Sequence, residues 1–170
     1  RIKENILQTN FQKLVSKVSA DFININQMNM DQKFADLLDR VGQFFLVDRT
    51  YIFLINHDQN TMTYAYEWCS QGVSSEAGLI QNVPLDVFPW WRSELSTNKL
   101  IHVEDIDDLP DAASNEKDTL SKQGVKSVMV VPIEQDGIML GFIGLDAVAS
   151  KKTRSSHHVE LLRVLSHLIA

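Results

Sequence analysis

Apolar side chains recur at helical spacing in three segments of the chain. In residues 2–22, at about 31–46 and again in 155–170, they fall three or four positions apart, the spacing of one face of an amphipathic helix. These positions are Ile2, Ile6, Leu7, Phe11, Leu14, Val15, Val18 and Phe22, then Phe34, Leu37, Leu38, Val41, Phe44 and Phe45, and finally Val159, Leu162, Leu165 and Ile169. The pattern predicts two helices at the start of the chain and one at its end.

Between these helices the pattern is that of strands. Residues 50–55 are β-branched and aromatic, as in a buried strand, and residues 56–60 carry turn chemistry. Residues 61–69 alternate between two faces, so the two segments predict a hairpin. One face holds Met62, Tyr64, Tyr66 and Trp68, and the other holds Glu67 and Cys69.

The second half of the chain mixes short helices with strands. Residues 70–85 are irregular, 86–95 predict a short helix with proline in its first turn, 99–103 a short strand, and 104–113 an acidic loop. Residues 114–123 predict a helix that Gly124 ends, and 126–134 and 138–147 predict a hairpin whose turn carries the Asp136-Gly137 signal. Gly144 inside the last strand marks a bend or a close approach. This order predicts an α+β fold with an antiparallel sheet.

Length, charge and cysteine content exclude several classes of protein. The 170 residues suit a single domain, and 16 Lys+Arg against 22 Asp+Glu give a net charge of −6, with no basic stripe for nucleic acid. The single cysteine, Cys69, excludes an internal disulfide and favours the cytoplasm. No apolar run approaches the roughly 18 residues of a membrane span. The chain opens at Arg1 and stops inside an apolar-periodic segment, so we expect a piece of a longer protein, with no membrane part in this segment.

Several of these stretches resemble the GAF domain family, and the resemblance covers nearly the whole chain. Residues 47–54 resemble the first strand of the family, and 126–133, Gly137 and 140–145 resemble its C-terminal hairpin. Tyr66-Glu67-Trp68-Cys69 together with Phe88-Pro89-Trp90-Trp91 is similar to a subgroup in bacterial signalling proteins. Such domains often precede histidine kinase or diguanylate cyclase modules.

The resemblance implies a fold and a domain map. It implies a GAF-like, PAS-related antiparallel sheet with helices from both chain ends on one face and a cover of loops and short helices on the other. The whole of 1–170 would be one domain, with an N-terminal helix at 1–22, a cover segment at 70–125, and a C-terminal helix at 155–170 that leads to an effector domain. A cover of this kind encloses a small-molecule site.

Placement within the implied fold selects six candidate ligand contacts: Glu67, Trp68, Trp90, His102, Met129 and Asp146. Three of them, Glu67, Trp90 and Asp146, have a structural alternative. Glu67 is either a buried carboxylate under the cover or an edge glutamate facing solvent. Trp90 and Trp91 point about 100° apart on a helix, so at least one of them anchors the cover to the sheet. Asp146 either accepts a hydrogen bond from a ligand or satisfies backbone donors of the loop that follows.

The residues also bear on cofactors and catalysis. Bilin-binding members of the family attach their chromophore through a cysteine usually followed by histidine, whereas Ser70 follows Cys69 on a strand, which argues against covalent bilin. No metal-ligand spacing of histidines supports zinc, the acidic run 104–111 lacks the glycine of a calcium loop, and only His102 leaves haem open. No catalytic constellation is recognisable, so an enzyme is not expected.

Two functions remain. The first is a non-catalytic sensory domain that binds an unidentified small ligand and signals through its terminal helices; the second is a structural dimerisation and linker module without a ligand. Both predict a homodimer through the apolar stripes of the terminal helices, at Leu7, Phe11, Leu14, Val18, Leu162, Leu165 and Ile169. The alternative is that both stripes pack only on their own sheet.

Overall fold

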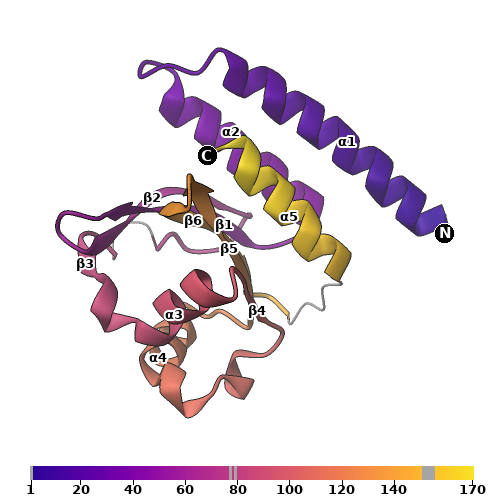
Figure 1. Ribbon diagram of the computed structural model, residues 1–170. Helices are drawn as coiled ribbons and strands as arrows, with labels where there is room; N and C mark the ends of the chain where they lie inside the picture. Colours follow the sequence, from indigo (N-terminus) through magenta and orange to yellow (C-terminus); the bar gives the residue numbers. More distant parts are fainter. Residues whose placement is uncertain (1, 77, 79, 151–155) are drawn as a thin grey trace.

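Three layers make up the fold: a helical layer, a central sheet, and a cover of short helices (Figure 1). The computed structural model describes residues 2–76, 78, 80–150 and 156–170, so positions 1 and 155 of the expected terminal helices lie outside the described residues. The helices are α1 (Ile2–Ile23), α2 (Met30–Phe45), α3 (Pro89–Thr97), α4 (Ser114–Lys122) and α5 (Ser156–Leu168). None of the described helices is long and apolar enough to cross a membrane.

The sheet is antiparallel and has the strand order β3-β2-β1-β6-β5-β4. Its strands are β1 (Arg49–Asn56), β2 (Thr61–Cys69), β3 (Val83–Pro84), β4 (Ile101–Val103), β5 (Ser127–Gln135) and β6 (Ile138–Ala147). The β5–β6 hairpin turns at Asp136 and Gly137, both with positive φ, as the Asp-Gly signal predicts. The predicted α+β architecture with an antiparallel sheet is confirmed.

The helical layer packs on one face of the sheet and forms an apolar core. α2 and α5 contact the sheet directly, and α1 packs across them. Phe11, Leu14 and Val18 of α1 are buried here, as are Leu162 and Leu165 of α5. The stripes that we expected to pair two chains therefore contribute most of their side chains to the core of a single chain.

A β-bulge in β2 changes which side chains of this strand point toward the helices and which toward the cover. Ile52 pairs with Tyr66, but Phe53 pairs with Tyr64, so Ala65 is an extra residue in β2. Tyr66 and Trp68 consequently face the helices, whereas Met62 and Tyr64 face the cover. The expectation that Tyr64 shares a face with Tyr66 and Trp68 is wrong, because the bulge inverts the alternation within the strand.

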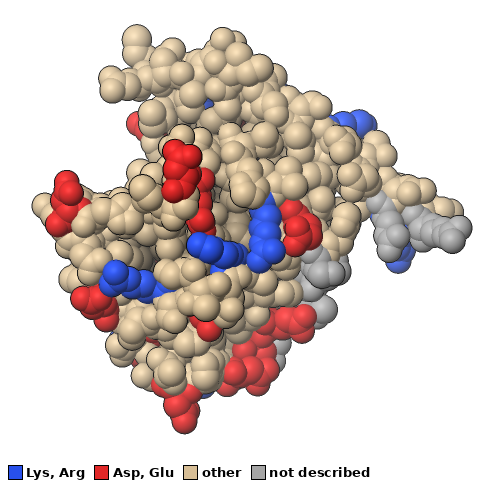
Figure 2. Space-filling model, in the orientation of Figure 1, with Lys and Arg blue, Asp and Glu red and all other residues tan. Residues whose placement is uncertain are grey.

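The cover packs on the other face of the sheet around aromatic side chains. It consists of α3, α4, the 3-10 turns η1 (Leu85–Val87), η2 (Ile106–Asp108) and η3 (Asp111–Ala113), and their connections. The two 3-10 turns after β4 stand where the sequence predicted an acidic loop. On the face seen in Figure 2, acidic side chains gather toward the cover, and Lys and Arg form no continuous stripe.

Candidate functional site

A cavity of about 50 Å³ lies between the sheet and the cover. Its floor comes from β1, β2 and β6, and its roof from α3, α4 and the segment that leads to them. Aromatic rings dominate the lining, and two carboxylates, Glu116 and Asp146, complete it. The lining residues are Tyr51, Phe53, Met62, Tyr64, Ile80, Phe88, Trp91, Glu116, Thr119, Leu120, Gln123, Phe142 and Asp146.

The alternation of side chains along β1 and a glycine in β6 position the aromatic rings on the sheet side of the cavity. Tyr51 and Phe53 project from the central strand β1 toward the cover. Gly144 lies opposite Tyr51 on β6, and a Cβ atom at Gly144 would come within 2.3 Å of the Tyr51 ring. The sequence predicts a close approach at Gly144, and the structure shows that the Tyr51 ring is the group that lies against it.

Asp146 is buried at the edge of the cavity, and only one of its carboxylate oxygens makes a hydrogen bond of good geometry. The Nη1 of Arg49 donates to its Oδ2 at 3.0 Å, whereas its Oδ1 has no partner with hydrogen-bond geometry among the described residues. Burial raises the pKa of Asp146 to about 6, although the Arg49 guanidinium and the Tyr51 hydroxyl both oppose that rise. The same burial, together with the Asp146 carboxylate, holds the pKa of Tyr51 well above its usual value.

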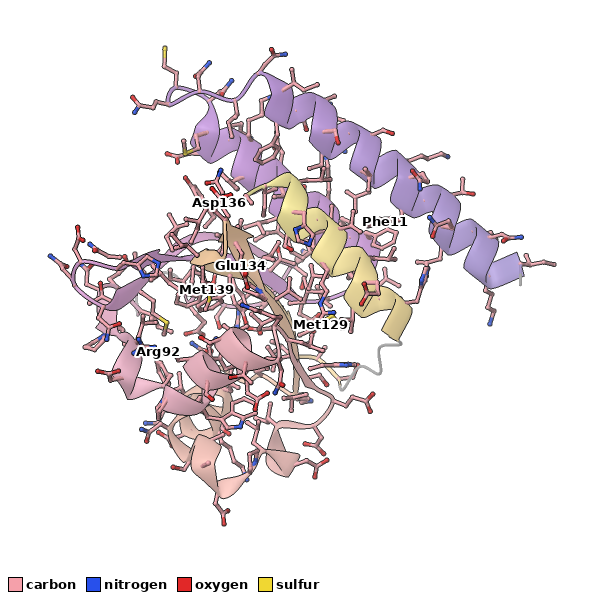
Figure 3. The ribbon with its side chains drawn as sticks, viewed as in Figure 1. Phe11, Arg92, Met129, Glu134, Asp136 and Met139 are labelled. Atoms are coloured by element: carbon pink, nitrogen blue, oxygen red, sulfur yellow. The ribbon has the colours of Figure 1, made fainter. Side chains whose placement is uncertain are left out.

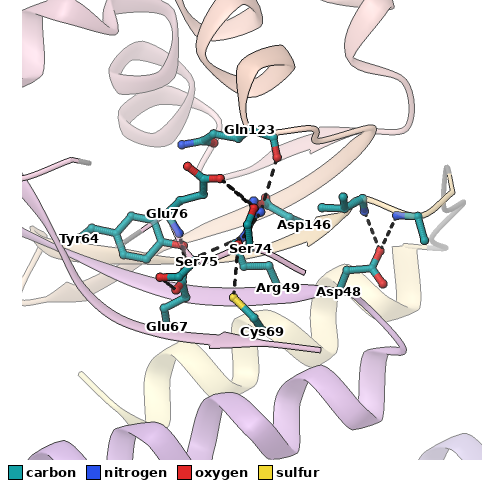
Figure 4. A network of polar contacts seen from close by, with 12 residues as sticks. Asp48, Arg49, Tyr64, Glu67, Cys69, Ser74, Ser75, Glu76, Gln123 and Asp146 are labelled. Carbon is teal, nitrogen blue, oxygen red and sulfur yellow. Dashed lines mark hydrogen bonds and ion pairs between the residues drawn. The ribbon is translucent and has the colours of Figure 1, made fainter. Parts of the chain in front are cut away.

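Arg49 connects the sheet to the cover through a network of polar contacts (Figure 4). Its side chain is 1% exposed, and its Nη2 donates to the backbone oxygens of Ser74 at 3.1 Å and Gln123 at 3.5 Å. Ser74 belongs to the segment after β2, and Gln123 follows α4. One guanidinium therefore joins β1, β6 and two parts of the cover.

Two further carboxylates face Arg49 at longer range. Glu67 Oε2 lies 3.9 Å from its Nε, and Glu76 Oε1 lies 3.8 Å from its Nη2. Glu67 also accepts hydrogen bonds from the Tyr64 hydroxyl at 2.9 Å, the Glu76 amide at 2.8 Å, and the Ser75 hydroxyl. Three carboxylates thus share one cation beneath the cover.

Glu116 is the second carboxylate of the cavity, and no described residue forms an ion pair with it. Its residue is 2% exposed, and neither carboxylate oxygen makes a hydrogen bond with good geometry to a described residue. Burial raises the pKa of Glu116, while the nearby amides of Glu116 itself and of Trp90 counteract part of that rise. An unpaired carboxylate in such a place is unfavourable for folding, which makes it a candidate for binding a ligand.

A wider groove of about 670 Å³ adjoins the cavity on the same face of the sheet. Both share the lining residues Met62, Phe88, Trp91 and Phe142. Arg92 of α3 and Met139 of β6 line the groove and lie at the end of the sheet next to α3 (Figure 3).

The structure brings two of the six predicted contacts to the polar network and distributes the others elsewhere. Asp146 lines the cavity, and Glu67 lies beside it in the network around Arg49. Trp68 and Met129 pack in the core between the sheet and the helical layer, on the far side of the sheet (Figure 3 for Met129).

The last two predicted contacts also lie away from the cavity. His102 borders a small hollow with Val47 and Met129, and its Nε2 is buried without a hydrogen-bond partner among the described residues. Trp90 is partly buried against the cover, and its neighbour Trp91 lines the cavity. The structure thus separates the two tryptophans, as helical geometry requires.

Arg49 and Glu116 were missed by the sequence reasoning. Arg49 opens β1 and is fully buried, but a charged residue at a strand end is also common on a surface. Glu116 carried a detectable signal, because Glu116 and Leu120 recur at the spacing of one face of the predicted helix, and both are buried.

Metal and thiol chemistry find little support in this site. Among the described residues, no group of three or more His, Cys, Asp or Glu side chains is arranged to hold a metal ion. The Sγ of Cys69 lies 3.7 Å from the Ser74 backbone oxygen, and burial together with the Glu67 carboxylate raises the pKa of Cys69 to about 11. The thiol is therefore protonated at neutral pH and a poor nucleophile.

Comparison with known sequences identifies a match over most of the chain. The family model described as "GAF domain" matches residues 29–170. The methanogenesis regulatory histidine kinase FilI of Methanothrix harundinacea (strain 6Ac) is 27% identical over an alignment of 158 residues, and the match covers 89% of this chain. This chain spans only 17% of the length of that relative.

Solved structures show the same fold at low sequence identity. The phycoerythrobilin-bound GAF domain of a cyanobacterial phytochrome has a TM-score of 0.78 at 18% identity, and the match covers 95% of this chain and 93% of that one. The chromophore-binding domain of the Stigmatella aurantiaca bacteriophytochrome (Thr289His mutant) has a TM-score of 0.75 at 14% identity, covering 96% of this chain and 58% of that one.

Proposed function

The chain belongs to the GAF domain family, a family of generally non-catalytic sensory domains, and from this we propose that it binds a small ligand beneath its cover and signals through its terminal helices. One observation carries the proposal. The cavity holds two buried carboxylates with unpaired oxygens on one face of a sheet whose other face supports α2 and α5. A polar site that weakens the fold is understandable where it recognises a ligand.

The central strands can couple the two faces. Neighbouring residues of β1 point in opposite directions, with Tyr51 in the cavity wall and Ile52 in the helical core. On β6, Asp146 lines the cavity and Leu145 packs toward the helices. A ligand that binds one arrangement of the cover better than another would shift these strands and, through them, α5 and α1.

We expect Arg49 to transmit the effect of ligand binding from the cover to the sheet. It holds the Ser74 segment, the end of α4 and Asp146 at once. A ligand that competes for Asp146 or draws α4 closer changes these contacts together. Because the guanidinium is buried, water cannot replace the hydrogen bonds that it loses. A change in its contacts would therefore shift the strands.

The relative suggests the context of the signal. FilI is a histidine kinase, so we propose a histidine kinase effector in the full-length protein, ahead of the diguanylate cyclase alternative. A cytoplasmic location and a homodimer belong to the same proposal. The exposed side chains Ile2 and Ile6 of α1 and Val164 of α5 would serve the dimer, since most of the predicted stripe is already buried in one chain.

Covalent bilin is not part of the proposal, although bilin-bound domains are similar in fold. The thiol of Cys69 is on β2 and protonated, and a cavity of about 50 Å³ is small for a tetrapyrrole. That small volume also favours the second candidate function, a dimerisation and linker module without a ligand.

A thermal-shift screen of a metabolite library on the purified chain separates the two functions. Sensing predicts at least one compound that raises the melting temperature in a saturable way. Substitution of Asp146 by Asn should weaken that effect, whereas Glu160→Asn on the exposed side of α5 should leave it unchanged. A library without a single saturable hit would support the linker module instead.

A further inference from the structure

We propose that the ligand is a small organic cation, an ammonium group with methyl or short alkyl substituents, held between Glu116 and Asp146 and against the aromatic wall of the cavity. The inference rests on the proposed function and names the chemical class of its ligand.

The charge around the cavity favours a cation. Among the described residues Glu116 has no counterion, and the Oδ1 of Asp146 makes no hydrogen bond of good geometry, although the Tyr51 hydroxyl lies near this carboxylate. Of the described residues no Lys or Arg lines the cavity, and the buried cation beside it, Arg49, already faces Asp146, Glu67 and Glu76. Buried negative charge in excess of positive charge is unfavourable, and a cationic ligand would correct the imbalance.

The wall of the cavity favours an organic cation over a metal ion. Rings of Tyr51, Phe53, Tyr64, Phe88, Trp91 and Phe142 line it. Aromatic rings attract alkylated ammonium groups through their π-electrons, and this attraction increases where water is excluded. Hard metal ions need about six oxygen ligands instead, and the described residues offer no such cluster.

The volume suits a small head group. About 50 Å³ holds on the order of four water-sized atoms, which is close to the size of a methylated ammonium. The adjoining groove of about 670 Å³ shares Met62, Phe88 and Trp91 with the cavity and leaves room for a longer substituent.

Three probes of similar size and different charge test the inference by calorimetry and thermal shift at constant ionic strength. They are tetramethylammonium chloride, neutral tert-butanol, and anionic pivalate. The expected result is saturable binding of tetramethylammonium that is at least tenfold tighter than that of either other probe. Equal binding of tert-butanol or tighter binding of pivalate would overturn the inference.

The variant Glu116→Gln sharpens the test. It removes a buried charge and keeps the shape, so the melting temperature of the free protein should stay equal or rise, while affinity for tetramethylammonium falls at least tenfold. The control Asp118→Asn makes the same charge change on the exposed side of α4, where Asp118 pairs with Lys122. It should alter neither quantity, and unchanged affinity in Glu116→Gln would contradict the role of Glu116.

The two experiments together separate the charge of the ligand from the question whether the chain binds a ligand at all. A saturable hit in the metabolite screen that is neutral or anionic would overturn the cationic class and leave ligand sensing in place. The absence of any hit, with no binding of tetramethylammonium, would overturn both.

Discussion

The two faces of the sheet are packed with different chemistry. On the helical face, the core formed with α1, α2 and α5 consists of buried apolar side chains. On the cover face, a second core of aromatic and aliphatic side chains lies beside all the buried charged residues among the described positions: Arg49, Glu76, Glu116 and Asp146. Since unpaired buried charge weakens a fold, we expect the helical face to contribute more to stability than the cover face, where we propose that the ligand binds.

A large-to-small substitution in the helical core should have the largest effect. Phe45 of α2 is 1% exposed, and Phe45→Ala should lower the free energy of unfolding by about 3–5 kcal/mol through lost burial and a new cavity. Urea denaturation measures the loss. Affinity for tetramethylammonium should stay unchanged where the variant is folded, and a parallel loss of binding would contradict the division between the faces.

Removal of the central cation of the cover face should come next. Arg49→Met leaves Asp146 and Glu67 without their shared partner, so we expect a loss of about 3 kcal/mol at pH 7.5. The loss should be smaller at pH 5, because the carboxylates can then take up protons. Arg163→Met, which breaks a surface pair with Glu160, should cost less than about 1 kcal/mol. Equal losses of unfolding free energy in Arg49→Met and Arg163→Met would contradict a special role of Arg49.

The stability of the free protein should depend on the pH through Asp146. Its pKa is raised from 3.8 to about 6 by burial against the opposition of Arg49 and Tyr51, so the folded state binds more protons than the unfolded state between these values. The contribution of Asp146 is therefore fully present below about pH 4 and is lost as the pH rises through 6, by on the order of 2–3 kcal/mol.

Urea denaturation between pH 4 and 7.5 checks this dependence in the Glu116→Gln background, where the second buried carboxylate no longer titrates. Adding Asp146→Asn should flatten the slope between pH 4 and 6, whatever its effect on absolute stability. Identical slopes with and without Asp146 would show that another group is responsible.

A single methyl group tests the fit of Tyr51 and should have the smallest effect of these changes. Gly144→Ala places a Cβ within 2.3 Å of the Tyr51 ring, and we expect a loss of about 1–3 kcal/mol from overpacking. The control Gly78→Ala meets no atom within 4 Å and should change stability by less than about 0.5 kcal/mol. Ring displacement in Gly144→Ala should also weaken cation binding.

The helical face could be predicted from the sequence far better than the cover face. Apolar periodicity identified α1, α2 and α5, and the Asp136-Gly137 signal identified the β5–β6 turn, because these features depend on local spacing. Trp68 and Met129 were assigned to a ligand site because spacing alone does not say which face of a strand lies under the cover. The bulge at Ala65 then inverted the facing of Tyr64, and no residue type in β2 marks it.

The polar network depends on contacts between distant parts of the chain. Arg49 and Asp146 are 97 positions apart, and Ser74 and Gln123 come from separate segments of the cover. Glu67 and Asp146 were identified as candidates because each is a carboxylate within an apolar strand. Glu116 could have been found in the same way, as a carboxylate on the apolar face of a short helix.

Native mass spectrometry of the gently purified chain, followed by denaturing mass analysis, asks whether the cover face holds a ligand. We expect a folded chain with a small additional mass that denaturation releases and that tetramethylammonium displaces. A folded chain with the mass of the bare polypeptide, unchanged after exposure to a metabolite library and to tetramethylammonium, would contradict a ligand-binding role for the cover face.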